Sequence, residues 1–167
     1  MPFAVTHILF PIIVLDELKK HWSALKRRLT MHTLLVAGVA GLLPDADILV
    51  ELVFAAGGAT LDIHRLYTHT FVIPLVIAGV ALAFKGRRRW LLLAAAFGWA
   101  THVTLDLLVG GEVSHFFPFA GPAEIGLLVN ASMPLEMRTA ILAGLDAAVF
   151  LVWLWHEEKY KKLKDFF

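Results

Sequence analysis

Long apolar stretches separated by short charged segments run through the whole chain. Five of them approach the roughly 20 apolar residues that a membrane-spanning helix requires. They cover residues 3–18, 33–56, 70–84, 90–109 and 139–155. The first, third and fifth are shorter than this length, so their ends are the least sharply marked. The pattern predicts an all-α polytopic membrane protein with about five transmembrane helices, forming a single domain over residues 1–167.

Composition agrees with this assignment. Of the 167 residues, 59% are hydrophobic and 17% are charged, and the mean hydropathy is +0.73. A soluble domain is about a quarter charged. A net charge of +1 gives no bulk attraction to nucleic acid, so no nucleic-acid partner is expected. The absence of cysteine excludes disulfides and thiolate metal ligands. The first ten residues lack the basic region and cleavage site of a cleaved signal peptide.

The lysine and arginine residues predict an orientation. All of the 15 basic residues except Arg65 and Arg138 fall within residues 19–28, 85–89 and 159–164, which five spans place on one side of the membrane. The positive-inside rule then puts the N-terminus outside and the C-terminus inside, so we expect a multi-pass protein of the plasma membrane. We interpret the basic segments as topology signals and lipid-headgroup contacts rather than as binding sites.

Ionisable residues inside the spans gather on the opposite, outer side. The separation from Thr33 to Asp45 equals that from Trp90 to His102, and each corresponds to about 18 Å of helix, so Asp45 and His102 are expected at the same depth. Ionisable groups inside a membrane are costly and usually functional. The sequence therefore predicts one shared site that faces the extracytoplasmic side. The other residues expected there are His7, Asp47, His64, His69 and Asp106.

Two motifs carry most of this prediction. His102 and Asp106 are four residues apart, so they share a helix face and can reach one metal ion. The alternative is a His–Asp hydrogen bond that joins two helices.

In "GLLPDADILV", Pro44 removes a backbone donor, so the helix should kink or restart there. A restart would put Asp45 and Asp47 in a first turn, where the helix dipole favours carboxylates and where both could merely act as caps.

The segment "HRLYTHTF" supplies two histidines that are too far apart for one helix face. His64 and His69 converge if the first lies in the loop and the second opens the next helix. Arg65 is the only basic residue of this outer loop, so it either binds an anionic substrate group or pairs with Asp62. Asp146 is a candidate to orient a ligand histidine. Further candidates are Glu112 and His115, whereas His21, His32 and His156 are set aside because they lie on the inner side.

The donor set indicates a divalent metal. The predicted ligands are His7, Asp45, Asp47, His64, His69, His102 and Asp106. Imidazoles and carboxylates without cysteine suit zinc, manganese or iron(II) better than calcium or magnesium. There are more donors than one tetrahedral ion uses, so one or two ions are expected, zinc first among them, and a pair of ions is typical of phosphatases and nucleases. Asp47 is expected as a ligand or as the general base, and Arg65 as the group that binds the substrate anion.

The motifs resemble those of a known family. "THILF", "GLLPDADI", "HRLYTHTF" and "GWATHVTLD" closely resemble the YdjM-type family, described as LexA-binding, inner membrane-associated metal-dependent hydrolases. The family pattern falls on His7, Pro44, Asp45, Asp47, His64, Arg65, Thr68, His69, His102 and Asp106. Thr70 stands where the family usually has serine. The resemblance covers roughly the first two-thirds of the chain. The same ordered set is similar, more weakly, to that of zinc-dependent phospholipase C, which implies phosphoester hydrolysis.

We therefore expect a membrane-embedded hydrolase that acts on a phospholipid or lipid-linked (phospho)ester at the outer interface through a metal-activated water. Membrane lipid and a lipid-like substrate are the expected partners, and the sequence leaves a protein partner unknown. One alternative is a metal-ion or proton transporter, but nothing ionisable lies between residues 33 and 45 or between 90 and 102. Another alternative is a non-catalytic scaffold with a structural metal, which the surplus of ligands disfavours.

Overall fold

The described parts of the chain contain helices joined by turns and loops, and no strands. This computed structural model describes residues 2–59, 64, 67–110, 114, 116–121, 125–130 and 132–160. The elements are α1 (Ala4–His21), α2 (Ser23–Lys26), α3 (Met31–Leu42), the 3₁₀ helix η1 (Leu43–Ala46), α4 (Asp47–Ala56), α5 (Val72–Leu82), α6 (Gly86–Val109) and α7 (Leu135–Lys159). All five predicted apolar stretches are thus helical, and the short α2 is an addition that the hydropathy pattern does not predict.

Three helical stretches are long and apolar enough to cross a membrane. They are Met31–Ala56, Gly86–Val109 and Leu135–Lys159. The apolar α5 has only 11 residues, and α1 carries charged side chains along its second half. The all-α class is confirmed for the described residues, while the number of five spans and their orientation stay predictions.

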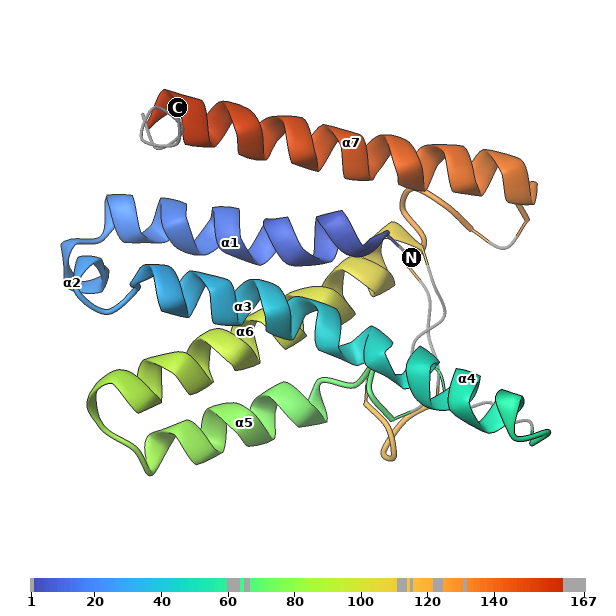
Figure 1. The fold of residues 1–167 in the computed structure, drawn as a ribbon, viewed down its shortest axis with the longest axis horizontal. Helices are drawn as coiled ribbons and strands as arrows, with labels where there is room; N and C mark the ends of the chain where they lie inside the picture. The colour runs from blue at the N-terminus through green and yellow to red at the C-terminus, as the bar shows by residue number, and fades with distance from the viewer. Residues whose placement is uncertain are drawn as a thin grey trace.

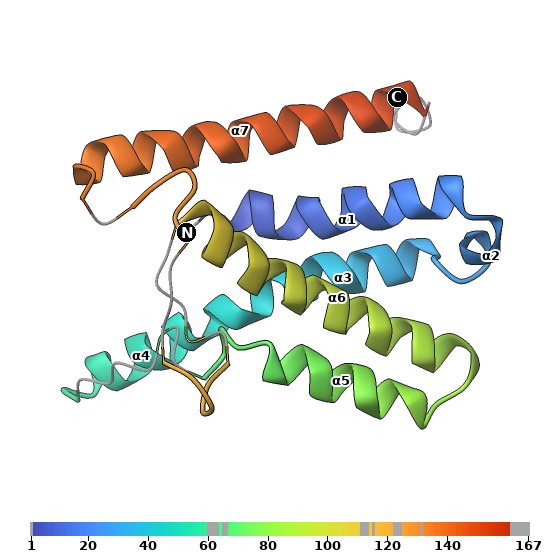
Figure 2. The same cartoon turned by 180° about the vertical axis from the view of Figure 1, so that it is seen from behind.

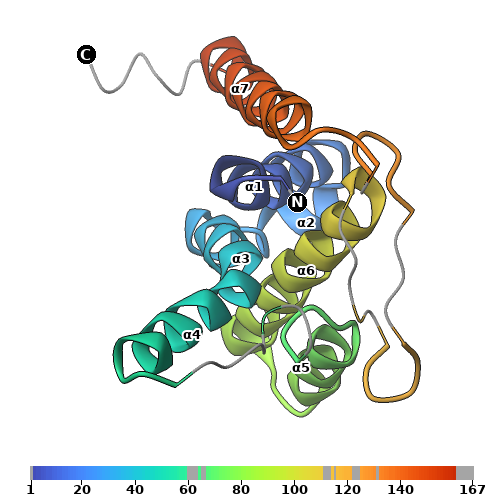
Figure 3. The same cartoon turned by 90° about the vertical axis from the view of Figure 1, so that its right-hand side faces the viewer.

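The long helices run roughly lengthwise through the molecule (Figure 1). The short α2 and the α5–α6 connection lie at one end, and the N-terminus and α4 lie at the other, as the reverse view also shows (Figure 2). Seen along the molecule, α7 lies outside α1, while α1, α3 and α6 pack together (Figure 3). The basic residues at the ends of α1, α2 and α7 and in the α5–α6 connection therefore share one end of the fold.

The stretch over residues 33–56 is not one continuous helix. α3 ends at Leu42, η1 follows, and α4 begins at Asp47. Pro44 occupies the first turn of η1, where its missing N–H needs no helical partner. The predicted restart at Pro44 is confirmed. Neither η1 nor α4 has a side-chain hydrogen bond that caps its start, so the interpretation of Asp45 and Asp47 as mere caps is wrong.

Glycines allow α3 to pass very close to α1 and α6. A Cβ atom at Gly98 of α6 would overlap the backbone carbonyl of Ala37, and one at Gly41 of α3 would overlap the carbonyl of His7. Small residues permit this kind of close helix packing in membrane proteins. Pro11 lacks the N–H that would bond the His7 carbonyl four residues earlier in α1, so that carbonyl is left to face Gly41.

α7 is held against α1 by a polar contact. The backbone N–H of Thr6 donates to Asp146 Oδ1 at 3.0 Å, and the Thr6 hydroxyl donates to the same oxygen. Asp146 was predicted to orient a ligand histidine, and this prediction is wrong for the described residues. Asp146 Oδ1 accepts both hydrogen bonds from Thr6, the residue before His7, and, among the described residues, not one from a histidine. Asp146 therefore links α7 to α1, the helix that carries His7.

Gly98→Ala tests the close packing of α3 and α6. We expect it to lower the free energy of unfolding by about 1–3 kcal/mol, because the new methyl group meets the Ala37 backbone, which cannot move aside without separating the helices. Gly79→Ala on α5 is the matched control, since a Cβ there meets nothing within 4 Å. The control should be neutral or stabilising by up to about 1 kcal/mol. Thermal unfolding of the detergent-purified variants measures both, and equal effects would contradict the packing argument.

Candidate metal centre

Residues from four segments bring their donor atoms together in two overlapping groups, His7–His102–Asp106 and Asp45–His69–His102, which share His102. His7 comes from α1, Asp45 from η1, His69 from the segment before α5, and His102 and Asp106 from α6. The Nε2 atoms of His69 and His102 are 3.0 Å apart. Asp45 Oδ1 lies 3.3 Å and 3.5 Å from these two nitrogens, and Asp106 Oδ2 lies 3.4 Å and 3.3 Å from them. We call these five residues the central cluster.

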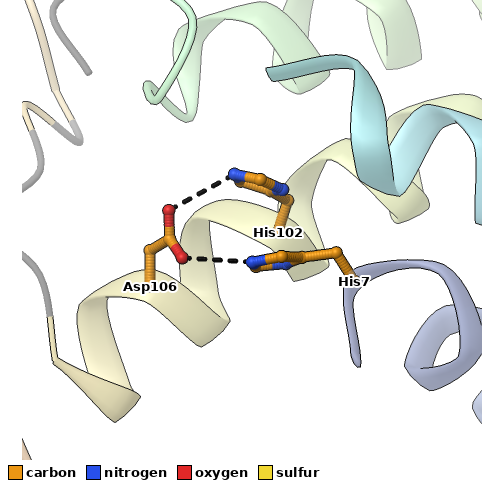
Figure 4. Close-up of side chains that lie close together, drawn as sticks. All are labelled: His7, His102 and Asp106. Atoms are coloured by element: carbon orange, nitrogen blue, oxygen red, sulfur yellow. Dashed lines mark ion pairs between the residues drawn. The ribbon is translucent and has the colours of Figure 1, made fainter. Parts of the chain in front are cut away.

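Asp106 links the two sides of the central cluster. Its Oδ1 is 3.3 Å from His7 Nε2, while its Oδ2 faces His102 (Figure 4). The rings of His7 and His102 stack with centroids 3.9 Å apart. The predicted sharing of a helix face by His102 and Asp106 is confirmed, and so is their convergence with His7.

The geometry and the missing hydrogen bonds both fit a metal ion. Tetrahedral zinc with nitrogen and oxygen ligands holds donor atoms about 3.3 Å apart. The contacts among His69, His102, Asp45 and Asp106 run from 3.0 to 3.5 Å. Both ring nitrogens of His7 and both carboxylate oxygens of Asp106 are buried and lack a hydrogen-bond partner among the described residues. Their ion-pair contacts with each other and with neighbouring imidazoles are 3.3–3.4 Å long. Buried polar atoms without a hydrogen bond are rare and costly, and a divalent cation would satisfy several of them together.

Helix packing sets the tautomer of His102. Its Nδ1–H donates to the carbonyl oxygen of Gly41 at 2.7 Å, which leaves the lone pair of Nε2 pointing into the central cluster. The acceptor lies on α3 at the point where α3 passes closest to α1. The contact that packs α3 against its neighbours therefore also orients a candidate ligand.

A second hydrogen-bond chain orients His69. The hydroxyl of Thr68 donates to Asp47 Oδ2, so its oxygen is free to accept from His69 Nδ1–H at 2.9 Å. This arrangement leaves Nε2 of His69 unprotonated and facing the central cluster. Burial lowers the pKa of the His69 imidazole and so favours the neutral ring that metal binding requires. The Asp45 carboxylate opposes this effect, because the protonated ring could donate to it from Nε2.

Asp47 and His64 lie beside the central cluster rather than in it. His64 Nδ1 is 2.7 Å from Asp47 Oδ1, and the backbone N–H of His64 donates to Glu51 Oε1 at 2.6 Å. With His69 they form a second group of donors spaced for a metal ion. His69 Nδ1 is 3.7 Å from Asp47 Oδ2, but the hydrogen bond to Thr68 occupies this nitrogen. All seven predicted ligands therefore fall in three overlapping groups of donors, which share His69 and His102.

Some candidate residues lie outside the described parts of the chain. They are Asp62, Arg65, Glu112 and His115. The reasoning from spacing missed the orienting roles of Thr68 and the Gly41 carbonyl. Thr68 could have been found as a hydroxyl next to a predicted ligand histidine, whereas a backbone carbonyl leaves no signal in the sequence.

His156, set aside as an inner-side residue, belongs to another polar group at the opposite end. It lies with Asp16 and Glu157 at distances that a metal could bridge. The ammonium group of Lys20 already contacts His156 Nε2 and lies 3.0 Å from Asp16 Oδ2. A lysine therefore supplies the cation at this second location.

A buried cluster of imidazoles and carboxylates within apolar helices defines the class: a helical membrane protein with a candidate metal centre. The sequence profile of the family described as YdjM inner membrane protein matches residues 1–162, and the chain belongs to this family. The match extends well beyond the first two-thirds that the motifs predict. No curated protein and no solved structure matches the chain.

Thr68→Val tests the chain that orients His69. The substitution keeps the side-chain volume and removes the hydroxyl between His69 and Asp47. We expect it to weaken zinc binding about 10–100-fold, the range for groups that orient metal ligands. Thr104→Val is the matched control, because the Thr104 hydroxyl bonds only the Ala100 carbonyl of its own helix. Competition with a chelator gives both dissociation constants, and equal constants for the two variants would rule out the orienting role.

Proposed function

We propose that the protein is a membrane-embedded metal-dependent hydrolase whose metal is held by the central cluster. One observation carries the proposal: of the five cluster side chains, four are fully buried and one carboxylate is partly exposed. The side chains of His7, His69, His102 and Asp106 are fully buried, whereas that of Asp45 is 23% exposed. A catalytic metal site needs a coordination position that water and substrate can reach, and a site with all its ligands buried would not provide one. The exposed edge of Asp45 is where a substrate would approach.

The chemistry follows from the donors. When bound, a divalent ion here would polarise a phosphoryl or carbonyl oxygen and make water more acidic. Three imidazoles and two carboxylates suit zinc, and also manganese or iron(II). The hydrogen bond from His69 to Thr68 favours one ion at the central cluster over two. We infer that Asp47 orients His69 through Thr68, and we keep it as the proposed general base.

The surroundings of Asp45 favour a lipid substrate. Leu42, Leu43 and Ile48 flank it in sequence and are 37%, 45% and 47% exposed. A route past these side chains suits an amphiphile better than a small soluble ester. A phospholipid or lipid-linked phosphoester would bring its phosphate to the cluster while its chains stay among apolar residues. Arg65 keeps its proposed role of binding the substrate anion.

The interior between the two ends favours a one-sided site over a transport path. Leu15, Leu34, Ala37 and Ala94 form a buried apolar cluster on the side of the central cluster towards α2. A transporter needs polar groups that continue across the membrane. With the basic residues at the α2 end facing the cytoplasm, the central cluster would face the extracytoplasmic side.

Metal content tests the central cluster directly. We expect the purified protein to bind about one equivalent of zinc, manganese or iron, and Asp45→Asn and His102→Asn to lose most of it. His102→Asn is chosen because its amide can still donate to the Gly41 carbonyl while the ligand nitrogen is removed. His32→Asn, at an exposed position of α3, should bind metal as the wild type does. A wild type that takes up no metal after reconstitution would refute the metal centre.

Hydrolysis is tested separately, on the metal-loaded protein in mixed micelles of phospholipid and neutral detergent. We expect release of a phosphate-bearing headgroup or a fatty acid, with Asp45→Asn and His102→Asn at least about 100-fold slower, because the groups that stabilise developing charge contribute on this scale. His32→Asn should keep full activity. If the protein binds metal but hydrolyses no phospholipid, the proposed metal site is retained and the proposed lipid hydrolase activity is refuted.

A further inference from the structure

A second hollow, lined by cations, lies at the end of the fold opposite to the central cluster. It has a volume of about 670 Å³ and is formed where the α2–α3 and α5–α6 connections meet. Its lining consists of Arg27, Arg28, Thr30, Lys85, Gly86, Arg87, Arg89 and Trp90. Two of the three basic segments of the sequence thus face one shared space. A topology signal requires only that these charges lie on the same side of the membrane, not that they converge.

No negative charge balances this hollow within the described part of the chain. None of its lining residues is acidic, and the first turns of α3 and α6 contain no acidic residue. Both helices begin at the hollow, at Thr30 and Lys85, and neither start has a side-chain cap. Five cationic side chains held together repel one another, and the positive ends of two helix dipoles add to that charge. An anion in the hollow would relieve this repulsion.

The lining is also locally ordered. The Arg28 guanidinium lies over the Trp90 ring, with 5.0 Å between its carbon and the ring centroid. Leu29, between two lining residues, is buried in the apolar core and anchors this connection. Gly86 has a φ of 60°, which a residue with a side chain rarely adopts, and this conformation starts α6 directly after Lys85. The charged groups therefore project from the constrained connection between α2 and α3, from Lys85 and from the first turn of α6.

The hollow lies next to residues suited to the hydrocarbon edge of a bilayer. Met31 directly follows Thr30 and is 65% exposed, while Phe84 and Leu82, just before Lys85, are 36% and 67% exposed. Trp90, which is half-buried in the lining, is of the type enriched at membrane–water interfaces. A phosphate in the hollow would thus sit at headgroup level, with apolar side chains beside the acyl chains below it.

We propose that this hollow binds the phosphate of an anionic phospholipid headgroup, at the membrane surface opposite to the metal centre. Basic pockets between membrane helices are known to take such headgroups. The proposal is independent of the hydrolase activity, because the lining shares no residue with the central cluster. Free phosphate has the same recognition chemistry, so the experiment must separate the two sources.

The chain provides a matched control within the same two connections. Lys26 and Arg88 are adjacent in sequence to lining residues but do not line the hollow. The pair Arg28→Gln/Arg89→Gln therefore removes two charges from the hollow, and the pair Lys26→Gln/Arg88→Gln removes two charges beside it. Both pairs remove one charge from residues 26–28 and one from residues 88–89, so any difference between them reports on the hollow itself.

The full chain is purified, reconstituted in phosphatidylcholine vesicles and probed with spin-labelled phosphatidylglycerol or spin-labelled phosphatidylcholine. The fraction of spin-labelled phosphatidylglycerol bound to the protein, divided by the fraction of spin-labelled phosphatidylcholine bound, measures the preference for the anionic lipid. We expect the wild type to prefer phosphatidylglycerol, the hollow pair to lose about tenfold of this preference, and the control pair to keep it. Binding of radiolabelled inorganic phosphate in neutral detergent is measured in parallel.

The proposal would be overturned if both pairs lost the preference for phosphatidylglycerol equally, because lipid binding would then depend on the overall basic charge and not on the hollow. It would also be overturned if the wild type showed no such preference. Phosphate binding that only the hollow pair loses, with lipid preference unchanged, would assign the hollow to free phosphate and overturn the lipid. Circular dichroism and thermal unfolding check that the variants are folded. If the hollow pair is unfolded, Arg89→Gln is compared with Arg88→Gln, and the same outcomes apply to these single substitutions.

Discussion

The close approach of α3 to α1 and α6 is the constraint on which the rest of the structure depends. Gly41 has no side chain, so the backbone of His7 can lie against it, and the Gly41 carbonyl accepts the Nδ1–H of His102. A side chain at this position would push α1 away and move a candidate ligand with it. Helix packing and the chemistry of the site therefore rest on the same contact, and Gly98 maintains that contact from the side of α6.

The central cluster places opposite requirements on its surroundings. Neutral imidazoles are needed as ligands, yet two carboxylates without a balancing cation are costly in a buried site. The protein meets the first requirement through the partners of Nδ1: Gly41 for His102, and Thr68 with Asp47 for His69. A metal ion would meet the second. The residues around the candidate ligands thus prepare the site for a cation before any cation binds.

The two charged regions lie at opposite ends of the helices. The central cluster is rich in carboxylates and imidazoles, while the hollow between α2 and the α5–α6 connection is purely cationic in its charged lining. Between them lie the apolar contacts of Leu15, Leu34 and Ala94. This layer separates the two charged regions in space, as the proposed metal site at one membrane surface and the proposed lipid-binding hollow at the other require.

The sequence by itself determined the helical class, the break at Pro44 and most of the central cluster. Apolar length and the four-residue spacing of His102 and Asp106 depend only on local geometry, and equal depth in two helices predicted that Asp45 would meet them. Only the tertiary structure decided that Asp47 and His64 lie beside the cluster, that Asp146 bonds Thr6, and that two basic connections enclose a hollow. These outcomes depend on how far helices are rotated about their axes and on where connections meet, and side-chain packing between distant segments sets both.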